Sequence, residues 1–309
     1  MATPKHFLDL NYLDSKVLRN ILDDAALTKN ARNAVGQISA DSDAPLNGRL
    51  LAMIFEKPST RTRVSFHIAM RQLGGETINL VGRDTQLGRG ETAADTARVL
   101  SRYVDAIMVR TNNHGDLAEM SEVANVPVIN GLTDLTHPCQ VMADILTIEE
   151  KIGSINEKKL AWCGSGNNMA NSWIQAAARF GFELKIACPN ELLPDSNIVD
   201  WALGKGARLV INSDIDEVVN EADVVMTDTW VSMNDQDGDR LRKLLKPYQV
   251  TEERMKMARD SAIFLHCLPA HRGEEVTEEV IDGPQSCVWD EAENRIHAQK
   301  SILKWCLSD

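Results

Sequence analysis

The chain has 309 residues, enough for two domains of ordinary size, and its composition, 43% hydrophobic and 25% charged, is that of a soluble globular protein. The formal net charge of −12 disfavours nucleic acid and membrane as partners, because both attract a basic face, although a few arginines in one cleft can still bind a small anion. No apolar run is long enough for a membrane span, no secretory signal is evident, and the six cysteines lack CxxC spacing, so we expect a cytoplasmic protein with reduced thiols and no metal.

The first half of the chain alternates short apolar runs with helical patterns. Leu50–Phe55 is a continuous apolar run, as expected of a strand that is buried on both faces. Ser59 follows as a helix cap, and the helix after it ends at Gly74-Gly75. We expect three further strands in this half, at Thr77–Leu80, Ala106–Arg110 and Pro127–Asn130.

The second half begins after a long helix over His137–Ile152 and ends in a helix over Glu291–Leu307. Between them we expect strands at Leu160–Cys163, Leu184–Cys188, Arg208–Ile211, Asp223–Thr227 and Ala262–His266. The predicted fold class is therefore α/β, with two domains, each a mostly parallel sheet flanked by helices, joined by a long interdomain helix. The expected boundaries are residues 1–136, the helix 137–153, residues 154–290, and a C-terminal helix 291–309.

The segment Ser59–Arg63 (STRTR) is the strongest chemical motif. The free backbone N–H groups at the start of a helix favour an anion, and the hydroxyls and Arg61 add donors at the same place. A capped helix with two solvated arginines is the alternative. Five consecutive Ser, Thr and Arg residues directly after a buried strand favour the anion site.

A second motif, Thr136–Gln140 (THPCQ), opens the long helix. Pro138 suits the first helical position, which leaves His137 and Gln140 together at the mouth of the helix. A histidine there can donate to a carbonyl oxygen and polarise it, and a capping histidine is the alternative.

Two more motifs follow strands of the second half. Leu265–Gly273 places Cys267 at the carboxyl edge of a sheet, where ligands bind in open α/β folds. This cysteine could be a nucleophile, a proton-transfer group or a small hydrophobe, and the lack of a Cys–His relay disfavours a covalent role. Asp228, after the preceding strand, could bind a substrate ammonium group or cap a helix.

The segment Trp162–Ala170 superficially resembles a dinucleotide-binding fingerprint. Two details oppose that interpretation, because Met169 stands at the third glycine position and Ala187–Asn190 carries no acidic residue for a ribose. We therefore expect no nicotinamide cofactor, and we interpret Asn168 as a polar contact to a small substrate.

Taken together and in this order, the motifs resemble the aspartate/ornithine carbamoyltransferase family across nearly the whole chain. STRTR and HPxQ are marks of its carbamoyl phosphate domain, while HCLPA and the D-x-x-x-S-M pattern beginning at Asp228 are typical of members that use ornithine. One departure is Asn234, which follows Ser232-Met233 where glycine is usual and bears on the geometry of that loop.

The resemblance implies transfer of a carbamoyl group from carbamoyl phosphate to the δ-amine of L-ornithine, giving L-citrulline and phosphate in arginine biosynthesis. It also implies a homotrimer without a cofactor, in which residues 1–136 bind carbamoyl phosphate and residues 154–290 bind ornithine. The expected catalytic residues are Cys267, Arg110, His137 and Arg295. The expected carbamoyl phosphate contacts are Ser59, Thr60, Arg61, Thr62, Gln86, Arg110, His137, Pro138, Cys139, Gln140, Cys267, Leu268 and Arg295. The expected ornithine contacts are Asn168, Asp228, Ser232 and Met233.

Three alternatives remain at this point. The first is a carbamoyltransferase for putrescine, a modified ornithine or aspartate; the amine-side motifs disfavour aspartate, and putrescine would leave Asp228 and Asn168 without partners. The second is a noncatalytic regulator with the same fold, which the complete set of polar residues disfavours. The third is a nicotinamide-dependent dehydrogenase.

Overall fold

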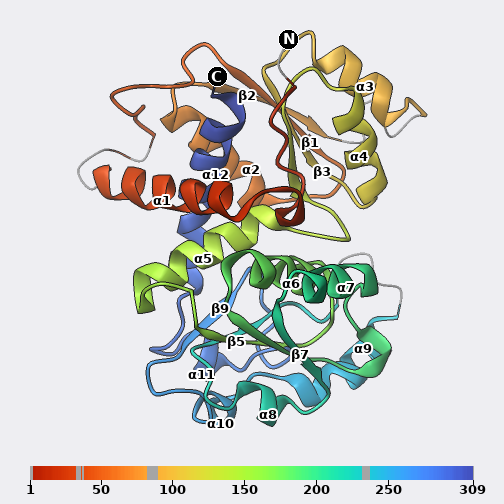
Figure 1. Cartoon of the computed structure of the whole chain (residues 1–309), viewed down its shortest axis with the longest axis vertical. Helices are drawn as coiled ribbons and strands as arrows, with labels where there is room; N and C mark the ends of the chain where they lie inside the picture. Colours follow the sequence, from red (N-terminus) through yellow and green to blue (C-terminus); the bar gives the residue numbers. More distant parts are fainter. Residues whose placement is uncertain (1–2, 33–35, 37, 82–89, 232–236, 309) are drawn as a thin grey trace. The chain divides into compact units, whose positions relative to one another are not determined.

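The computed structural model describes residues 3–32, 36, 38–81, 90–231 and 237–308. The chain divides into two compact units, residues 1–143 together with 293–309, and residues 144–292. The divisions fall inside helix α5 (Pro138–Ile152) and inside helix α12 (Val288–Leu307), which Figure 1 draws in yellow-green and dark blue. All nine expected strands are present, in two parallel sheets flanked by helices, so the predicted fold class is confirmed.

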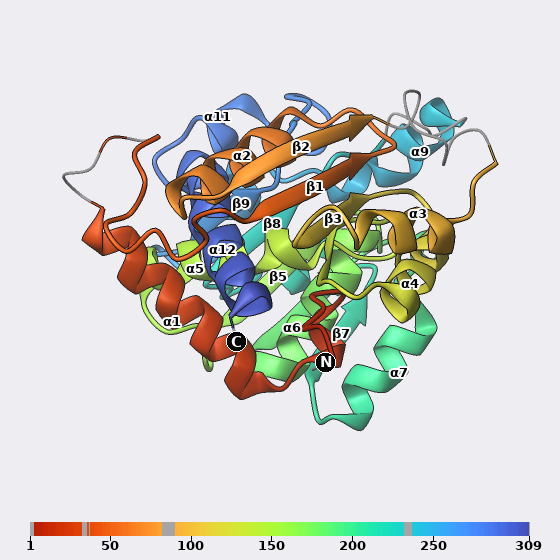
Figure 2. The ribbon, with the colours of Figure 1, turned by 90° about the horizontal axis from the view of Figure 1, so that it is seen from above.

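The first unit contains a four-stranded parallel sheet in the order β2-β1-β3-β4, with β2 as the edge strand beside β1 (Figure 2). The two central strands are buried along nearly their whole length, which explains why their sequences are continuous apolar runs. In the parallel register Phe55 lies opposite Arg110, so the carboxyl ends of β1 and β3 meet at the same edge. The strands are β1 (Leu50–Phe55), β2 (Glu76–Val81), β3 (Ala106–Arg110) and β4 (Val128–Leu132).

Helices cover both faces of this sheet. Alternate side chains of the strands, such as Ile54 and Ile107, pack against Ala97 and Leu117 of α3 and α4 in one apolar core. Helices α2 and α12 lie on the opposite side of the sheet from α3 and α4 (Figure 1). The helices of this unit, besides its parts of α5 and α12, are the short 3₁₀ helix η1 (Leu10–Tyr12), α1 (Ser15–Ala31), α2 (Thr60–Gln72), α3 (Ala93–Leu100) and α4 (His114–Val123).

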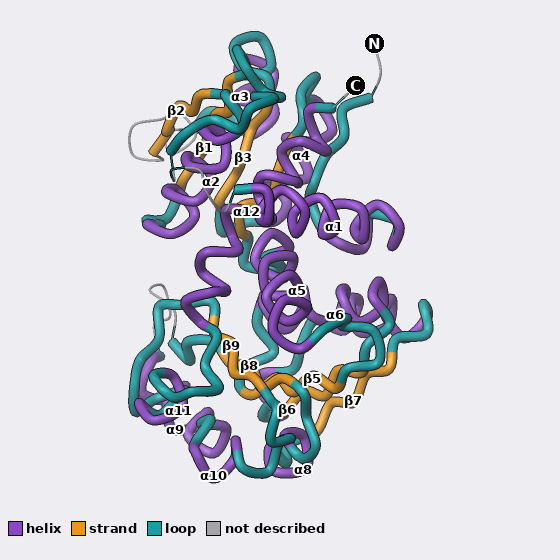
Figure 3. Tube along the Cα trace, turned by 90° about the vertical axis from the view of Figure 1, so that its left-hand side faces the viewer, coloured by secondary structure: helices purple, strands orange, loops and turns teal. Residues whose placement is uncertain are grey.

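The second unit contains a five-stranded parallel sheet in the order β7-β6-β5-β8-β9. Figure 3 shows helix α6 on one side of this sheet and α8 and α10 on the other. The strands are β5 (Lys159–Cys163), β6 (Glu183–Ala187), β7 (Arg208–Asn212), β8 (Val224–Thr227) and β9 (Ile263–His266). The helices are α6 (Asn168–Phe180), η4 (Asn190–Leu192), α7 (Ser196–Gly204), α8 (Ile215–Val219), α9 (Gly238–Leu245), η5 (Lys246–Tyr248), α10 (Glu252–Met255) and α11 (Glu278–Ile281).

The carboxyl-terminal part of α12 is held in the first unit by charged contacts with α1 and the segment after it. Lys300 is fully buried, and its Nζ lies 2.7 Å from Asp41 Oδ2. Lys304 Nζ lies 2.6 Å from Asp24 Oδ1, and Figures 1 and 2 both show α1 beside α12. Because a buried ammonium group is stable only beside an opposite charge, the Lys300–Asp41 pair ties α12 to the segment after α1, while Lys304 pairs with α1 itself.

No helix of the described part of the chain is long and apolar enough to cross a membrane.

We predict that His297, on α12, makes the protein less stable in mild acid. Burial lowers the pKa of His297 to about 4, and the positive charges of Lys29 and Lys300 add to that shift. Between pH 4 and the ordinary histidine pKa the unfolded chain binds more protons than the folded one, so stability falls as the pH falls through this range. Urea unfolding at pH 7 and at pH 4.5 should show wild type losing on the order of 1–3 kcal/mol more than His297→Asn. The prediction would be contradicted if the difference in unfolding free energy between wild type and His297→Asn were the same at pH 7 and at pH 4.5.

Candidate active site

The amino end of α2 is the candidate anion site of the first unit. Strand β1 leads into it, and Ser59 caps the helix by accepting a hydrogen bond from the backbone N–H of Thr62 at 3.3 Å. The helix begins at Thr60, so Arg61 lies in its first turn, where backbone N–H groups have no partner within the helix. This is the arrangement that the STRTR segment predicts, and it favours a phosphate group.

Two arginines converge on the hydroxyl of Thr62, which is fully buried. Arg110 Nη1, at the end of β3, donates to Thr62 Oγ1 at 3.2 Å, and Arg295 Nη2, on α12, donates to it at 2.6 Å. Arg295 Nη1 also donates to Gln140 Oε1 at 2.7 Å. A hydroxyl has two acceptor lone pairs and one proton, so Thr62 accepts from both guanidinium groups and keeps an O–H to donate. Four of the predicted residues, from four separate segments, thus meet at one point of the first unit.

His137 lies beside this cluster as a neutral imidazole. It is only 3% exposed and directly precedes α5, whose first residue is Pro138. Burial lowers the pKa of His137 well below its ordinary value, and the charges of Arg295, Arg110 and Arg61 lower it further. The ring is therefore uncharged at neutral pH and can donate one N–H to a carbonyl oxygen.

Cys139, the second residue of α5, directs its side chain to β4. Its Sγ donates to the backbone carbonyl of Asn130 in β4 at 3.2 Å, and burial raises the pKa of the thiol to about 12. The side chain of Cys139 is thus engaged within the first unit, and its contact with carbamoyl phosphate stays a prediction.

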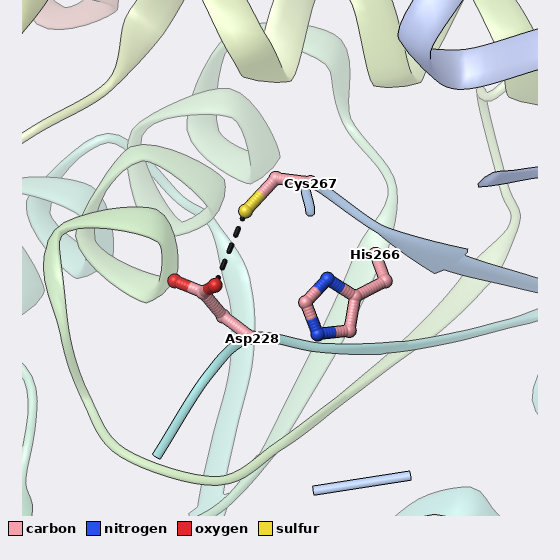
Figure 4. Close-up of side chains that lie close together, drawn as sticks. All are labelled: Asp228, His266 and Cys267. Carbon is pink, nitrogen blue, oxygen red and sulfur yellow. Dashed lines mark hydrogen bonds between the residues drawn. The ribbon is translucent and has the colours of Figure 1, made fainter. Parts of the chain in front are cut away.

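In the second unit, Asp228 and Cys267 meet at the carboxyl edge of the sheet (Figure 4). Thr227 of β8 lies opposite His266 of β9, so the residues that follow the two strands are neighbours. Cys267 Sγ donates to Asp228 Oδ1 at 3.2 Å. Burial raises the pKa of the Cys267 thiol well above its ordinary value, and the negative charges of Asp228 and Glu291 raise it further. The group is therefore a thiol that donates to the carboxylate, not a thiolate that could accept a proton.

Asn167, which the sequence analysis did not single out, contacts Asp228 in the second unit. Its Oδ1 caps α6 by accepting from two backbone N–H groups, while its Nδ2 donates to Asp228 Oδ2 at 2.9 Å. The predicted residue, Asn168, is the first residue of α6, and its carbonyl accepts from Ser172 Oγ at 2.8 Å. The sequence has two adjacent asparagines at this place, and only the second, Asn168, was singled out as a substrate contact.

A buried histidine supports the turn that carries Cys267 and Leu268. His266 Nδ1 accepts from the backbone N–H of Leu268 at 2.9 Å, and its Nε2 lies 3.3 Å from Glu275 Oε1. Leu268 has a φ of +57°, a conformation that is costly for a leucine, so these hydrogen bonds hold a strained backbone in place.

Two groups of side chains among the described residues have the composition of a metal site. In the first, Asp228, His266 and Cys267, both ring nitrogens of the histidine are already in use, Nδ1 with the Leu268 N–H and Nε2 with Glu275 Oε1, so the donor set does not fit a cation. The second is His271, Glu274 and Glu275, in which Glu274 already pairs with Arg242 at 3.0 Å. Neither group supports a step through a metal.

Three predicted contacts, Gln86, Ser232 and Met233, lie outside the described residues, as does the unusual Asn234. They stay predictions. For Ser59, Thr60, Arg61, Thr62, Arg110, His137, Gln140 and Arg295, the described geometry is compatible with the predicted roles.

Comparison with known proteins gives a consistent result over the whole chain. The family model for the carbamoyl-P binding domain of aspartate/ornithine carbamoyltransferase matches residues 5–150, and that for the Asp/Orn binding domain matches residues 156–306. The chain belongs to the aspartate/ornithine carbamoyltransferase family. The resemblance seen in the sequence is thereby confirmed. The same matches argue against the alternative of a nicotinamide-dependent dehydrogenase.

Individual relatives cover almost the full length. The chain is 58% identical to the ornithine carbamoyltransferase of Rhodopseudomonas palustris (strain BisA53) over 303 residues, 98% of this chain and 97% of the relative. It is 56% identical to that of Agrobacterium fabrum, with 99% of each chain covered. Among solved structures, the ornithine carbamoyltransferase from Pyrococcus furiosus is 45% identical with a TM-score of 0.91, covering 98% of this chain and 96% of that one.

We predict that the Cys267 thiol reacts slowly with an alkylating reagent until the pH is high. Its pKa is raised well above 9, and only the thiolate attacks iodoacetamide. The rate of carbamidomethylation at Cys267, followed by peptide mass spectrometry in the ligand-free protein, should therefore still be rising at pH 9. A rate that reaches its plateau below about pH 8 would show a thiolate and contradict the assignment.

Proposed function

We propose that this chain is an ornithine carbamoyltransferase, which transfers the carbamoyl group of carbamoyl phosphate to the δ-amine of L-ornithine and gives L-citrulline and phosphate. The observation that carries the proposal is the convergence of Arg110 and Arg295 on Thr62 at the amino end of α2. That cluster suits an acyl phosphate, which needs one site for a phosphate group and a second for a carbonyl oxygen. Relatives bearing this name, 56–58% identical over nearly the full length, support ornithine as the acceptor.

The first unit would bind carbamoyl phosphate. Ser59, Thr60 and Arg61, with the N–H groups of the first turn of α2, are proposed to hold the phosphate. The carbonyl oxygen would receive hydrogen bonds from His137 and from the two arginines that meet at Thr62. A ligand oxygen that replaced Thr62 as an acceptor would be met by donors already in position.

The second unit would bind ornithine through its charged groups. Asp228 carries a negative charge where the α-ammonium group of the substrate can meet it, and Asn168 suits the α-carboxylate. Cys267 is a thiol that donates to Asp228, and it is proposed to orient the δ-amine of ornithine rather than to deprotonate it.

The reaction then proceeds by attack of the neutral δ-amine on the carbonyl carbon. Negative charge develops on the carbonyl oxygen, and His137, Arg110 and Arg295 stabilise it as an oxyanion. The C–O bond to phosphate breaks as the oxyanion collapses, and Arg61 stabilises the leaving group. Because Cys267 retains its own proton, we assign the proton lost by the amine to the departing phosphate, which balances the step.

The remaining proposals concern organisation. We propose that residues 1–136 form the carbamoyl phosphate domain and 154–290 the ornithine domain, and that the enzyme is a cytoplasmic homotrimer acting in arginine biosynthesis. The trimer follows from the family resemblance, and light scattering on the purified protein would test it, since a monomer or dimer at working concentration would rule it out.

The experiment that tests the activity is a steady-state assay of carbamoyl transfer from carbamoyl phosphate to ornithine, putrescine and aspartate in parallel. We expect citrulline from ornithine and a kcat/KM at least about a hundredfold lower for putrescine, which has no carboxylate and leaves the polar site unpaired. Faster turnover of putrescine or aspartate would overturn the assignment of the amine. Absence of turnover with all three would overturn the proposed function.

The phosphate assignment predicts a specific loss in Arg61→Gln. Removing one charged hydrogen bond to phosphate should raise the KM for carbamoyl phosphate by about tenfold or more. Arg71→Gln is the matched control, since Arg71 lies exposed in the last turn of the same helix and should keep the wild-type KM. Unchanged carbamoyl phosphate binding in Arg61→Gln would remove the central residue of the site.

Asn167 should matter for ornithine independently of its role as a helix cap. In Asn167→Ser the hydroxyl can still cap α6, but it loses the amide that donates to Asp228, so we expect the KM for ornithine to rise by about three- to tenfold with little change in melting temperature. Asn113→Ser is the control, because Asn113 caps α4 in the other unit in the same way. A variant with the wild-type KM would mean that Asn167 only caps its helix.

A further inference from the structure

The segment from Lys5 to Asp9 is a fixed part of the first unit. It runs along the outer edge of β4, where Phe7 N–H donates to Val128 at 2.9 Å and Phe7 C=O accepts from Asn130 N–H at 2.8 Å. The Phe7 side chain is fully buried, with its ring edge-on to Trp305 of α12 at 6.4 Å between centroids. The backbone that precedes Asp9 is therefore anchored on two sides.

Asp9 reaches from this segment to the residue that precedes His137. Its side chain is 3% exposed, and its Oδ1 accepts a hydrogen bond from the hydroxyl of Thr136. Thr136 Oγ1 in turn accepts from Asn130 Nδ2 at 3.1 Å, and both of these residues are fully buried. Since a hydroxyl has a single proton, the Thr136 proton is committed to Asp9.

The loop between β4 and α5 is closed around the same threonine. Thr133 N–H donates to Thr136 C=O at 2.9 Å, and Thr136 N–H donates to Thr133 Oγ1 at 3.2 Å. These bonds fix the peptide unit that joins Thr136 to His137. His114 links the carboxylate to the same loop, because its Nε2 lies 3.6 Å from Asp9 Oδ2 and its Nδ1 lies 3.0 Å from Thr133 Oγ1.

We propose that Asp9 is a positioning residue for the reaction, acting through Thr136 to hold the His137 imidazole at the carbonyl oxygen of the substrate. The proposal rests on the proposed function, in which His137 donates to that oxygen. The geometry that supports it is a buried carboxylate that accepts a hydrogen bond from the hydroxyl of Thr136, the residue directly before His137. Asp9 itself contacts no substrate in this assignment.

Positioning of this kind affects turnover more than binding. An oxyanion donor acts only when it lies within hydrogen-bond distance of the oxygen in the transition state, and a misplacement of about 1 Å can lower the rate by about a hundredfold. Ornithine binding, by contrast, depends on residues of the other unit. Substitution of Asp9 or Thr136 is therefore expected to lower kcat and to leave the KM for ornithine nearly unchanged.

The test compares Thr136→Val, Thr136→Ser and Asp9→Asn with wild type, measuring kcat, both KM values and the melting temperature. We expect kcat to fall by about ten- to a hundredfold in Thr136→Val and by less in Asp9→Asn, whose amide oxygen can still accept, with near wild-type kcat in Thr136→Ser. Thr96→Val is the matched control, because Thr96 Oγ1 donates to Glu91 Oε2 at 3.0 Å elsewhere in the same unit, and it should keep the wild-type kcat.

A second readout separates this proposal from the proposed function. In protein with ¹⁵N-labelled histidine, the His137 signal, assigned with His137→Asn, should shift in Thr136→Val and Asp9→Asn, whether or not wild type makes citrulline. Folded variants with wild-type kcat and an unshifted His137 signal would overturn the positioning role, as would Thr136→Ser impaired as severely as Thr136→Val. If Thr136→Val does not fold, Asp9→Asn decides by the same two measurements.

Discussion

Two guanidinium groups share one buried hydroxyl oxygen, and much of the first unit is built to allow it. Arg110 and Arg295 repel each other at Thr62, in surroundings from which water is largely excluded. Gln140 offers a second acceptor to Arg295, and the capped start of α2 holds Thr62 itself in place. The second arginine, Arg295, lies on the part of α12 that belongs to the first unit. Charged contacts with α1 hold this part of the helix in place. The result is a concentrated positive field that an entering dianion would relieve.

The two units carry opposite electrostatic signs at their candidate sites. In the first, positive charge keeps His137 from binding a proton. In the second, the negative charge of Asp228 and Glu291 keeps Cys267 from losing one. This difference matches the chemistry, because carbamoyl phosphate is an anion and the amino end of ornithine is a cation. It also opposes a thiolate base, which leaves the phosphate as the better destination for the proton of the amine.

The fold and part of the site could be predicted from local pattern. Buried strands such as Leu50–Phe55 and Ala106–Arg110 are recognisable as continuous apolar runs, and the STRTR segment directly after a strand predicts the capped start of α2. The position of Arg295 could not be derived from such patterns, because no periodicity links α12 to Thr62 across most of the chain, and only the family resemblance pointed to it. Which of Asn167 and Asn168 caps the helix and reaches Asp228 depends on the backbone geometry, which the sequence pattern does not give.

The charged residue Asp9 illustrates a different limit of sequence reasoning. In the sequence it is one more acid in a short amino-terminal segment, where solvent exposure is the normal expectation. Its burial depends on that segment pairing with the edge of β4 through the bridge at Phe7. No local sequence pattern indicates this long-range pairing. The residues Gln86, Ser232 and Met233 stay predictions from resemblance alone.

The division of the chain has a consequence for its synthesis. The first unit consists of the beginning and the end of the sequence, with the whole second unit between them. Translation therefore completes the whole second unit before it reaches Arg295, although the strands that surround its partner Thr62 emerge early. The buried cluster at Thr62 can therefore close only after the second unit has been synthesised, and a nascent chain that ends before Arg295 has one guanidinium group at Thr62 instead of two.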